Sequence, residues 1–364
     1  MGVSGGGCWV LSLLLVTSVC AAAACPCSEP ALCQPITHTR DPEVYVFHVR
    51  EKNWIHYDWS VVTTVALFAP YDPELMCYAH AKGARVVLTG DVQLSDIVDA
   101  RNRSAWVTQQ VNLAKSQYLD GINLDIEQAV PLYSQEYYAL TALVQETTEA
   151  FHREIPGSQV SFDVAWSPNC IALRCYNYTG IADLCDFLFV MSYDDQSLVW
   201  TESIAGANAP FNDIITGYVQ FINAGVSPKK LVMGVPWYGY DYTCLQLTET
   251  NQCKVQRPAL RRPGYREAVG DQVGYGSIMR QLNSSLSGRL WDDEQKAAFY
   301  NYKGSQGKIH QVWYDDPQSI SLKAAYIRKL GLRGIGMWHG DTLDYSSDPV
   351  AQQQTKDMWE ALLP

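Results

Sequence analysis

Polar and aliphatic side chains alternate in residues 119–128, where Asn123, Asp125 and Glu127 occupy every second position. A period of two is typical of a β-strand whose two faces meet different surroundings. Neighbours on one face of a strand lie about 6.5–7 Å apart, so each carboxylate disfavours ionisation of the other. We therefore expect Glu127 to hold a proton below neutral pH and to act as a general acid.

An exposed edge strand with an acidic face is the structural alternative. Against it, a turn at 118–121 precedes the strand, and a helix-like pattern follows from about Leu132. This order of helix, turn, strand and helix predicts a buried parallel strand, where a carboxylate without a role is costly. The chemical interpretation is favoured for that reason.

The elements that would position this strand alternate along the chain. Eight strand-like runs, most of them rich in Val, Ile and Phe, occupy 44–49, 62–69, 85–89, 121–127, 159–165, 187–193, 230–236 and 334–338. Helix-like patterns are clearest at 104–117, 134–153, 211–223, 320–330 and 348–362. Eight strands, each followed by a helix, predict an α/β protein with one domain, residues 25–364, folded as a (β/α)8 TIM barrel.

The connection after the seventh strand, residues 237–306, is too long for a simple loop. It is rich in Tyr, Gly and turn-forming residues, and a short strand-like run at 311–316 follows it. We expect a small inserted lobe over the carboxyl-terminal face of the barrel, where it would form one wall of a cleft.

Functional residues of such barrels lie where the strands end. Besides Tyr193, the residues expected to line a site at this rim are Asn123, Asp163, Met191, Asp194, Trp237 and Trp338. Several also have a structural interpretation, since Met191 could fill the core and Asp194 could cap a helix. A single tryptophan is likewise more often a core residue than a site residue.

Two of these stretches resemble motifs of glycoside hydrolase family 18, the chitinases and their relatives. The family pattern Asp-x-x-Asp-x-Asp-x-Glu is similar to the run that contains Asp120, Asn123, Asp125 and Glu127. Asn123 stands where most members carry the second Asp, which leaves open any step in which a second acid shares a proton with Asp125. Residues 191–194 resemble the Met-x-Tyr-Asp motif of the family. The resemblance also implies that Trp338 forms the floor of the sugar subsite beside the cleaved bond.

The resemblance implies a retaining glycosidase whose substrate supplies the nucleophile. Glu127 would protonate the glycosidic oxygen while the 2-acetamido carbonyl of the sugar attacks the anomeric carbon. Asp125 would orient the acetamido N–H and stabilise the oxazolinium ion, and Tyr193 would hydrogen-bond the acetamido oxygen. The ionised Glu127 would then activate water. No cofactor is implied.

The substrate implied is an oligosaccharide of β-1,4-linked N-acetylglucosamine. Residues 25–33, 120–128 and 336–341 resemble most the lysosomal members, which split the chitobiose core of degraded Asn-linked glycoproteins. An endo-acting chitinase, or a carbohydrate-binding lectin without turnover, is the alternative. Because Glu127, Asp125 and Tyr193 are all present, an enzyme is favoured over a lectin.

The front of the chain and its cysteines predict an oxidising compartment. Residues 1–24 read as a signal peptide, with an apolar run at 9–16 and alanines at 21–24. Cys170 with Cys175 and Cys244 with Cys253 could each staple a loop. Four more, Cys25, Cys27, Cys33 and Cys77, could tie down the amino-terminal segment, which leaves Cys185 unpaired. The glycosylation acceptors in an exported chain would be Asn102, Asn177 and Asn283.

The formal net charge is −11 and the pI about 5.1. This balance argues against nucleic-acid or anionic-membrane partners, which require basic patches. It suits a neutral sugar and an acidic lumen. The resemblance implies a lysosomal location, reached through the secretory pathway, and a monomer is expected. A metal site at Cys25 and Cys27 is disfavoured because no CxxC pair is present and His38 is the single histidine nearby. The one Gly-x-Ser-x-Gly match, residues 2–6, falls in the leader, so a catalytic triad is not predicted.

Overall fold

The computed structural model describes residues 24–38, 40–50, 52–195, 203–256, 260–262, 265–266 and 270–363. All but the last residue of the expected signal peptide lie outside these ranges, so that expectation stays a prediction.

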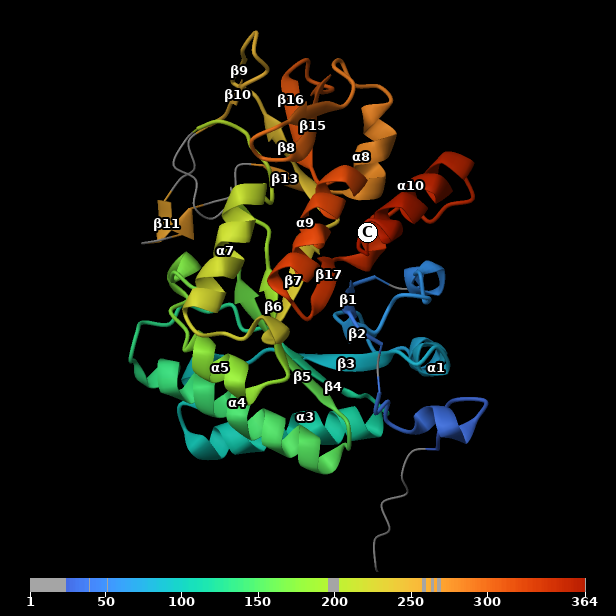
Figure 1. The fold of residues 1–364 in the computed structure, drawn as a ribbon, viewed down its shortest axis with the longest axis vertical. Coiled ribbons are helices and arrows are strands. Elements are labelled where there is room, and N and C mark those ends of the chain that lie inside the picture. The colour runs from blue at the N-terminus through green and yellow to red at the C-terminus, as the bar shows by residue number, and fades with distance from the viewer. Residues whose placement is uncertain are drawn as a thin grey trace, which may run out of the picture.

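Eight parallel strands close into a barrel (Figure 1), as expected from the sequence. They are β1 (Glu43–His48), β2 (Thr64–Leu67), β3 (Arg85–Gly90), β4 (Gly121–Leu124), β5 (Gln159–Ala165), β6 (Phe187–Met191), β7 (Leu231–Pro236) and β17 (Gly334–Trp338). The barrel closes where β1 pairs in parallel with β17. Three strands are shorter than predicted: β2 (predicted 62–69), β4 (predicted 121–127) and β6 (predicted 187–193). Because β4 ends at Leu124, Asp125 and Glu127 follow the strand rather than lie within it.

Helices follow the strands along the chain. The α-helices are α1 (Pro73–Ala81), α2 (Leu94–Ile97), α3 (Ala100–Ser116), α4 (Gln135–Glu154), α5 (Tyr178–Leu184), α7 (Phe211–Asn223), α8 (Tyr275–Leu282), α9 (Pro317–Leu330) and α10 (Pro349–Glu360). Short 3-10 helices occupy Pro30–Cys33, Asn53–His56, Ile171–Leu173, Pro228–Lys230 and Gly340–Thr342. Side-chain caps fix several starts: Asp316 and Asp348 each accept a backbone N–H just before a proline-initiated helix.

Aromatic side chains fill the interior of the barrel. Tyr45 and Phe47 of β1 are buried and meet Phe187 and Phe189 of β6, with ring centroids 4.7–5.7 Å apart. Such edge-on and tilted contacts stabilise a core beyond the area they bury. The barrel is thus packed solid below its rim, and chemistry is confined to the strand ends.

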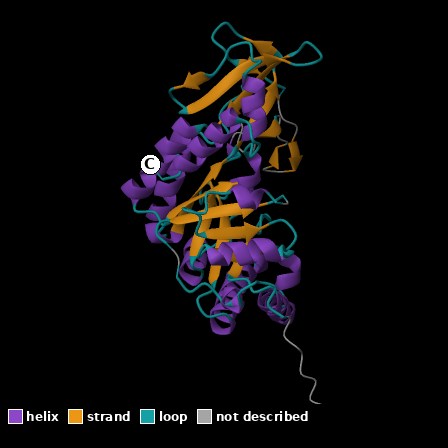
Figure 2. Cartoon of the chain, turned by 90° about the vertical axis from the view of Figure 1, so that its right-hand side faces the viewer, coloured by secondary structure: helices purple, strands orange, loops and turns teal. Residues whose placement is uncertain are grey.

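The expected lobe is present after β7, and the strand-like run expected at 311–316 belongs to it, at Ile309–Tyr314. Its sheet has the order β13 (Asp271–Gly274), β8 (Tyr238–Thr243), β16 (Ile309–Tyr314), β15 (Ala297–Lys303), β14 (Leu290–Asp292). Two small pairs complete it, β9 (Gln246–Leu247) with β10 (Cys253–Lys254) and β11 (Leu260–Arg262) with β12 (Tyr265–Arg266). Figure 2 shows the lobe sheet as a layer separate from the barrel.

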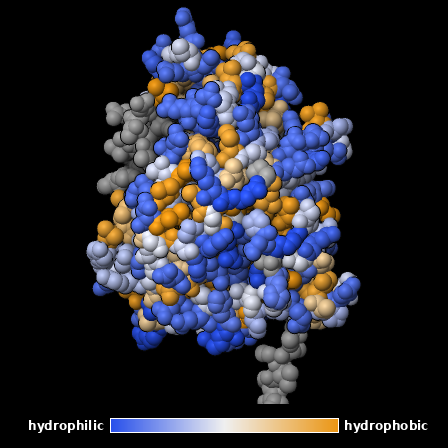
Figure 3. All heavy atoms as spheres, in the orientation of Figure 1, coloured by the Kyte–Doolittle hydropathy of each residue, from blue (hydrophilic) through white to orange (hydrophobic). Residues whose placement is uncertain are grey.

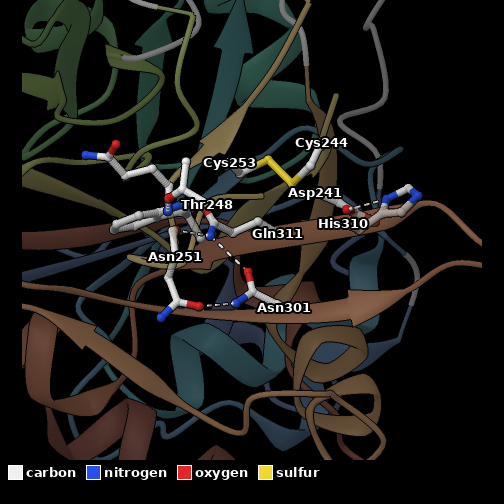
Figure 4. The surroundings of a disulfide bond; sticks show 10 residues. Asp241, Cys244, Thr248, Asn251, Cys253, Asn301, His310 and Gln311 are labelled. Atoms are coloured by element: carbon white, nitrogen blue, oxygen red, sulfur yellow. Dashed lines mark hydrogen bonds and ion pairs between the residues drawn. A yellow bond between two sulfur atoms is a disulfide. The ribbon is translucent and has the colours of Figure 1, made fainter. Parts of the chain in front are cut away.

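A disulfide and a polar cluster hold the lobe together (Figure 4). The disulfide joins Cys244 and Cys253. Below it, Gln311 donates through Nε2 to the Asn251 carbonyl at 2.8 Å and to Asn301 Oδ1 at 2.9 Å. The lobe therefore has an internal framework of its own, fastened by a covalent link near its tip.

The cysteine expectations are confirmed for the described residues. Disulfides join Cys170 with Cys175 and Cys244 with Cys253, and the amino-terminal segment is tied by Cys25–Cys33 and Cys27–Cys77. Cys185 is buried and free. The sulfurs at 25, 27 and 33 lie close enough together to suggest metal ligands, but all three are in disulfides.

Polar side chains cover most of the face shown in Figure 3, and the apolar ones lie in scattered groups. Within the described ranges, no helix is both long and apolar enough to cross a membrane.

Candidate active site

The predicted site residues gather at the carboxyl ends of alternate strands of the barrel, β4, β6 and β17. Asp125 and Glu127 follow β4, Tyr193 follows β6, and Trp338 is the last residue of β17. The side chain of Glu127 is 49% exposed, so a ligand can reach it. Ile126, between the two acids, is fully buried on the opposite side. The alternation read from the sequence therefore continues past the end of the strand.

Arg174, which the sequence analysis missed, contacts the expected acid. Its Nη1 donates to Glu127 Oε2 at 2.7 Å, and its side chain is only 7% exposed. It stands in the loop closed by Cys170–Cys175, immediately before the second cysteine. The sole sequence signal was that short disulfide loop after the fifth strand, since nothing in the spacing shows which way an arginine in it points.

The disulfide loop is fastened to the segment that carries Glu127. Val130 donates its N–H to the Leu173 carbonyl at 2.9 Å, and its own carbonyl accepts from Cys175 at 3.2 Å. Tyr176 places its hydroxyl 2.7 Å from the carbonyl oxygens of both Ile126 and Gln128. These carbonyls flank Glu127, so the backbone of the acid is held from both sides.

Asp125 has a strongly altered proton affinity. Burial raises the pKa of Asp125 to about 7, the negative charge of Glu127 acts in the same direction, and Arg174 opposes both. Its Oδ1 is buried and has no hydrogen-bond partner. At mildly acidic pH this carboxyl is therefore protonated and can donate a hydrogen bond.

Asn123 and Asp163 lie one layer below the rim, which corrects their expected role as substrate contacts. Asn123 is fully buried and Asp163 is 2% exposed, so neither can touch a sugar. Asn123 Nδ2 instead donates to Asp163 Oδ2 at 2.7 Å. Burial, followed by the charge of Asp125, raises the pKa of Asp163 well above its ordinary value. Alternation told us which face these residues share but not how deep they lie.

Tyr193 and Asp194 stand where the sixth strand leads to the lobe. Burial, together with the nearby charge of Asp163, raises the pKa of Tyr193 well above its ordinary value, which keeps its hydroxyl protonated as a donor. Asp194 Oδ1 accepts from the hydroxyls of Tyr238 and Tyr240 at 2.5 and 2.7 Å. Both tyrosines belong to β8, so the lobe is bonded directly to the rim.

The two tryptophans expected at the rim, Trp338 and Trp237, differ in their exposure. Trp338 is half-buried and contacts Phe47 and Phe68, with ring centroids 5.3 and 5.0 Å away. Trp237 is fully buried and packs on Trp359 of α10 at 4.9 Å. The prediction that Trp237 contacts the substrate is therefore wrong, because its ring lies in the core beneath the final helix. Met191, the last residue of β6, is half-buried at the rim.

The three glycosylation acceptors differ in access. Asn102 and Asn283 are exposed on α3 and at the end of α8. Asn177 is half-buried, and its Oδ1 accepts the Gly180 N–H as a cap for α5. Because Asn177 is half-buried, the first two are the stronger candidates.

A barrel with acids after its fourth strand and an aromatic rim is the architecture of a carbohydrate-cleaving enzyme, and the comparisons agree. Residues 81–342 match the family model of glycosyl hydrolases family 18. The chain belongs to this family and is a glycoside hydrolase.

Curated relatives span nearly the whole chain. It is 63% identical over 340 residues to "Di-N-acetylchitobiase" of Homo sapiens, covering 93% of this chain and 88% of that protein. It is 61% identical to the Mus musculus protein of the same name, covering 98% and 97%. Among solved structures, the immunomodulatory active chitinase TsES1 of Trichuris suis superposes with a TM-score of 0.73 at 18% identity, covering 88% of this chain and 98% of that one. This last likeness supports the barrel fold.

Proposed function

We propose that this glycosidase hydrolyses the β-1,4 bond of N-acetylglucosamine oligosaccharides, including the chitobiose core of degraded Asn-linked glycoproteins. The observation that carries the proposal is an accessible Glu127 beside the buried, proton-holding Asp125. The relatives named di-N-acetylchitobiase, at 61–63% identity, support the choice of substrate.

Glu127 donates its proton to the glycosidic oxygen as the bond to the anomeric carbon breaks. The carbonyl oxygen of the 2-acetamido group attacks that carbon and forms an oxazolinium ion. Protonated Asp125 and the hydroxyl of Tyr193 hold the acetamido group in place, which gains the advantage of an intramolecular reaction. Glu127, now ionised, takes a proton from the water that opens the ring, so the anomeric configuration is retained.

Arg174 keeps Glu127 oriented between these two proton transfers. Trp338 supplies a flat apolar surface at the rim, suited to the apolar face of a pyranose ring. The lobe strand β8 closes the side next to Asp194. These contacts would leave room for a short oligosaccharide that lies across the rim.

We also propose that the protein works in the lysosome after passing through the secretory pathway. Four disulfides fit an oxidising route of synthesis. Exposed Asn102 and Asn283 would carry glycans. A buried acid with a pKa of about 7 is protonated at lysosomal acidity, which suits the mechanism.

The test is the substitution Glu127→Gln, with Glu146→Gln as the matched control. Glu146 also pairs with an arginine, Arg103, at 2.8 Å, but it does so on the helical exterior. E127Q is expected to lose at least about 10²-fold in kcat on chitobiose while still binding the sugar, and E146Q to keep full activity. Near-normal turnover by E127Q would refute the assignment, and an inactive wild-type protein that binds the sugar would favour a lectin.

A further inference from the structure

The side chains below the rim donate their hydrogen bonds in one direction. Ser161 donates to Asn123 Oδ1 at 2.7 Å, which leaves the Tyr45 hydroxyl, 3.1 Å away, to donate to Ser161 Oγ. Asn123 Nδ2 then donates to Asp163 Oδ2. Because each member uses its proton toward the next, the row of donors ends on one oxygen of Asp163. All four side chains are buried.

The strand register places Asp163 next to Asp125. The register of β4 with β5 pairs Asn123 with Ser161 and Leu124 with Phe162. One further step places Asp125 beside Asp163, and neighbouring strands lie about 4.8 Å apart. Both residues share the inward face, since each is two positions beyond an inward-facing member of the row.

Each of the two carboxyls has one oxygen without a partner. Asp125 Oδ1 and Asp163 Oδ1 are both buried and make no hydrogen bond. Ionisation of both carboxyls at this spacing is disfavoured, because Asp163 is buried, Asp125 is half-buried and the two charges repel each other. A single proton between them satisfies both oxygens and removes one charge.

We propose that Asp163 and Asp125 hold one proton between them, so that the second acid missing at Asn123 is supplied from the adjacent strand β5. Asp163 is then a positioning residue, which acts on the substrate through Asp125. Asn123 has a defined part as an amide: its N–H fixes Asp163 Oδ2 as an acceptor and leaves Oδ1 for the shared proton. The raised pKa of both carboxyls agrees with this arrangement.

Other charged and titratable groups surround the pair and set its proton affinity. They are Asp91 after β3, Glu127 after β4, Arg174 in the disulfide loop, Tyr193 and Asp194 after β6, and Tyr45 on β1. Arg174 alone in this group favours loss of the proton, and the carboxylates favour its retention. The balance keeps the proton on the pair at acidic pH.

The test compares Asp163→Asn with the exchange Asn123→Asp plus Asp163→Asn, which returns the carboxyl to β4. The control is Asp186→Asn, a carboxyl that accepts the Val160 N–H at 2.7 Å before β6 begins. For D163N we expect kcat to fall at least about tenfold with little change in KM, since the buried residue touches no sugar. The alkaline limb of the kcat profile should move to lower pH by about half a unit or more.

The exchange variant should recover at least about a third of wild-type kcat, and D186N should leave the alkaline limb in place. A D163N profile that matches the wild type would overturn the proposal, as would an exchange variant no better than D163N. If D163N does not fold, a carbon-13 titration of the aspartate carboxyls in the wild-type protein decides. Two carboxyl signals that shift together near neutral pH support the pair, and an Asp163 signal that stays ionised down to pH 4 refutes it.

The pair depends on the proposed function, yet the two can fail separately. An active E127Q variant would refute the function whatever D163N does. An inactive E127Q variant together with an unaltered pH profile in D163N would refute the shared proton alone.

Discussion

Arg174 brings a positive charge into a group of carboxyls. It pairs with Glu127 at 2.7 Å and also opposes the rise in the pKa of Asp125. A guanidinium has a fixed, planar set of donors, so it controls orientation as well as charge. We infer that Arg174 holds the Glu127 carboxylate after its proton has left, at the stage when water must be activated.

Replacing Arg174 by Gln should lower kcat by about 10- to 100-fold, because the acid loses its orientation and the charge balance shifts. The proton of Asp125 should be held more tightly, so the alkaline limb of the pH profile should move to higher pH. Steady-state kinetics from pH 4 to pH 8 would measure both effects. Arg103→Gln, which removes the arginine of the exterior pair with Glu146, is the control and should change neither; a kcat for R174Q within twofold of that control would contradict the role.

Single residues were predictable where a local pattern decides their surroundings. Alternation identified Asp125 and Glu127 as one inward-facing pair, and the strand-end rule placed Tyr193 and Trp338 at the rim. Alternation cannot distinguish the buried layer from the rim, so Asn123 and Asp163 were assigned to the wrong depth. Trp237 was misjudged because its burial depends on α10, which begins 112 positions later at Pro349.

Two short elements determine where the acid points: the segment after β4 and the loop closed by Cys170–Cys175. Their contacts are the Val130 hydrogen bonds and the Tyr176 hydroxyl on the carbonyls either side of Glu127. Strands and long helices were predicted well, several to the residue, because their apolar periods are strong. These hydrogen bonds were not predictable, since they are made to backbone groups and leave no periodic pattern in the sequence.

Opening the small disulfide loop should impair catalysis more than stability. In the variant Cys170→Ser with Cys175→Ser, we expect kcat to fall at least about fivefold, because Arg174 and the Tyr176 hydroxyl are less firmly held. A bridge over so short a loop contributes modestly to the free energy of unfolding. Activity assays and thermal melts would compare it with Cys27→Ser plus Cys77→Ser, whose bridge spans 50 positions and whose loss should lower the melting temperature and spare kcat. Full activity in the first variant would show that the loop has no positioning role.

The molecule as a whole combines buried acids of two kinds. Burial raises the pKa of Asp125 and of Asp195 to about 7, and it also raises that of Asp163 well above its ordinary value. For Asp341, burial acts to raise the pKa, but bonds from His339 and His48 outweigh it and lower it. The first kind stabilises the fold while protonated, and the second while ionised.

Stability should therefore be greatest at mildly acidic pH. A carboxyl with a raised pKa binds its proton more tightly when folded, so its contribution is complete below about pH 4 and is lost as the pH rises through about 7. Asp341 contributes above about pH 4 and fails only in stronger acid. We expect the melting temperature to fall by at least about 3 °C between pH 5 and pH 8, and the fall to be smaller in Asp125→Asn. A melting temperature that rises over this range would contradict the protonated state of these acids.

The barrel, its single domain and the lobe after the seventh strand were predictable because eight βα units leave one compact solution. The strand pairing within the lobe was not, since β16 pairs with β15 and, across a long stretch of chain, with β8. The lobe matters to the site through the two tyrosine hydroxyls on Asp194. The barrel, the lobe beside the site and the position of Glu127 are thus determined by contacts at three different scales.

The most direct measurement compares two chromogenic disaccharides that differ only at the 2-position of the sugar whose bond is cut. One carries the acetamido group and the other a hydroxyl. Because the amide oxygen is the attacking atom, we predict that the hydroxyl compound is cleaved at least about 10³-fold more slowly in kcat/KM, and that the acetamido compound releases its sugar with the configuration retained. Equal rates, or an inverted product, would contradict substrate-assisted catalysis by Glu127.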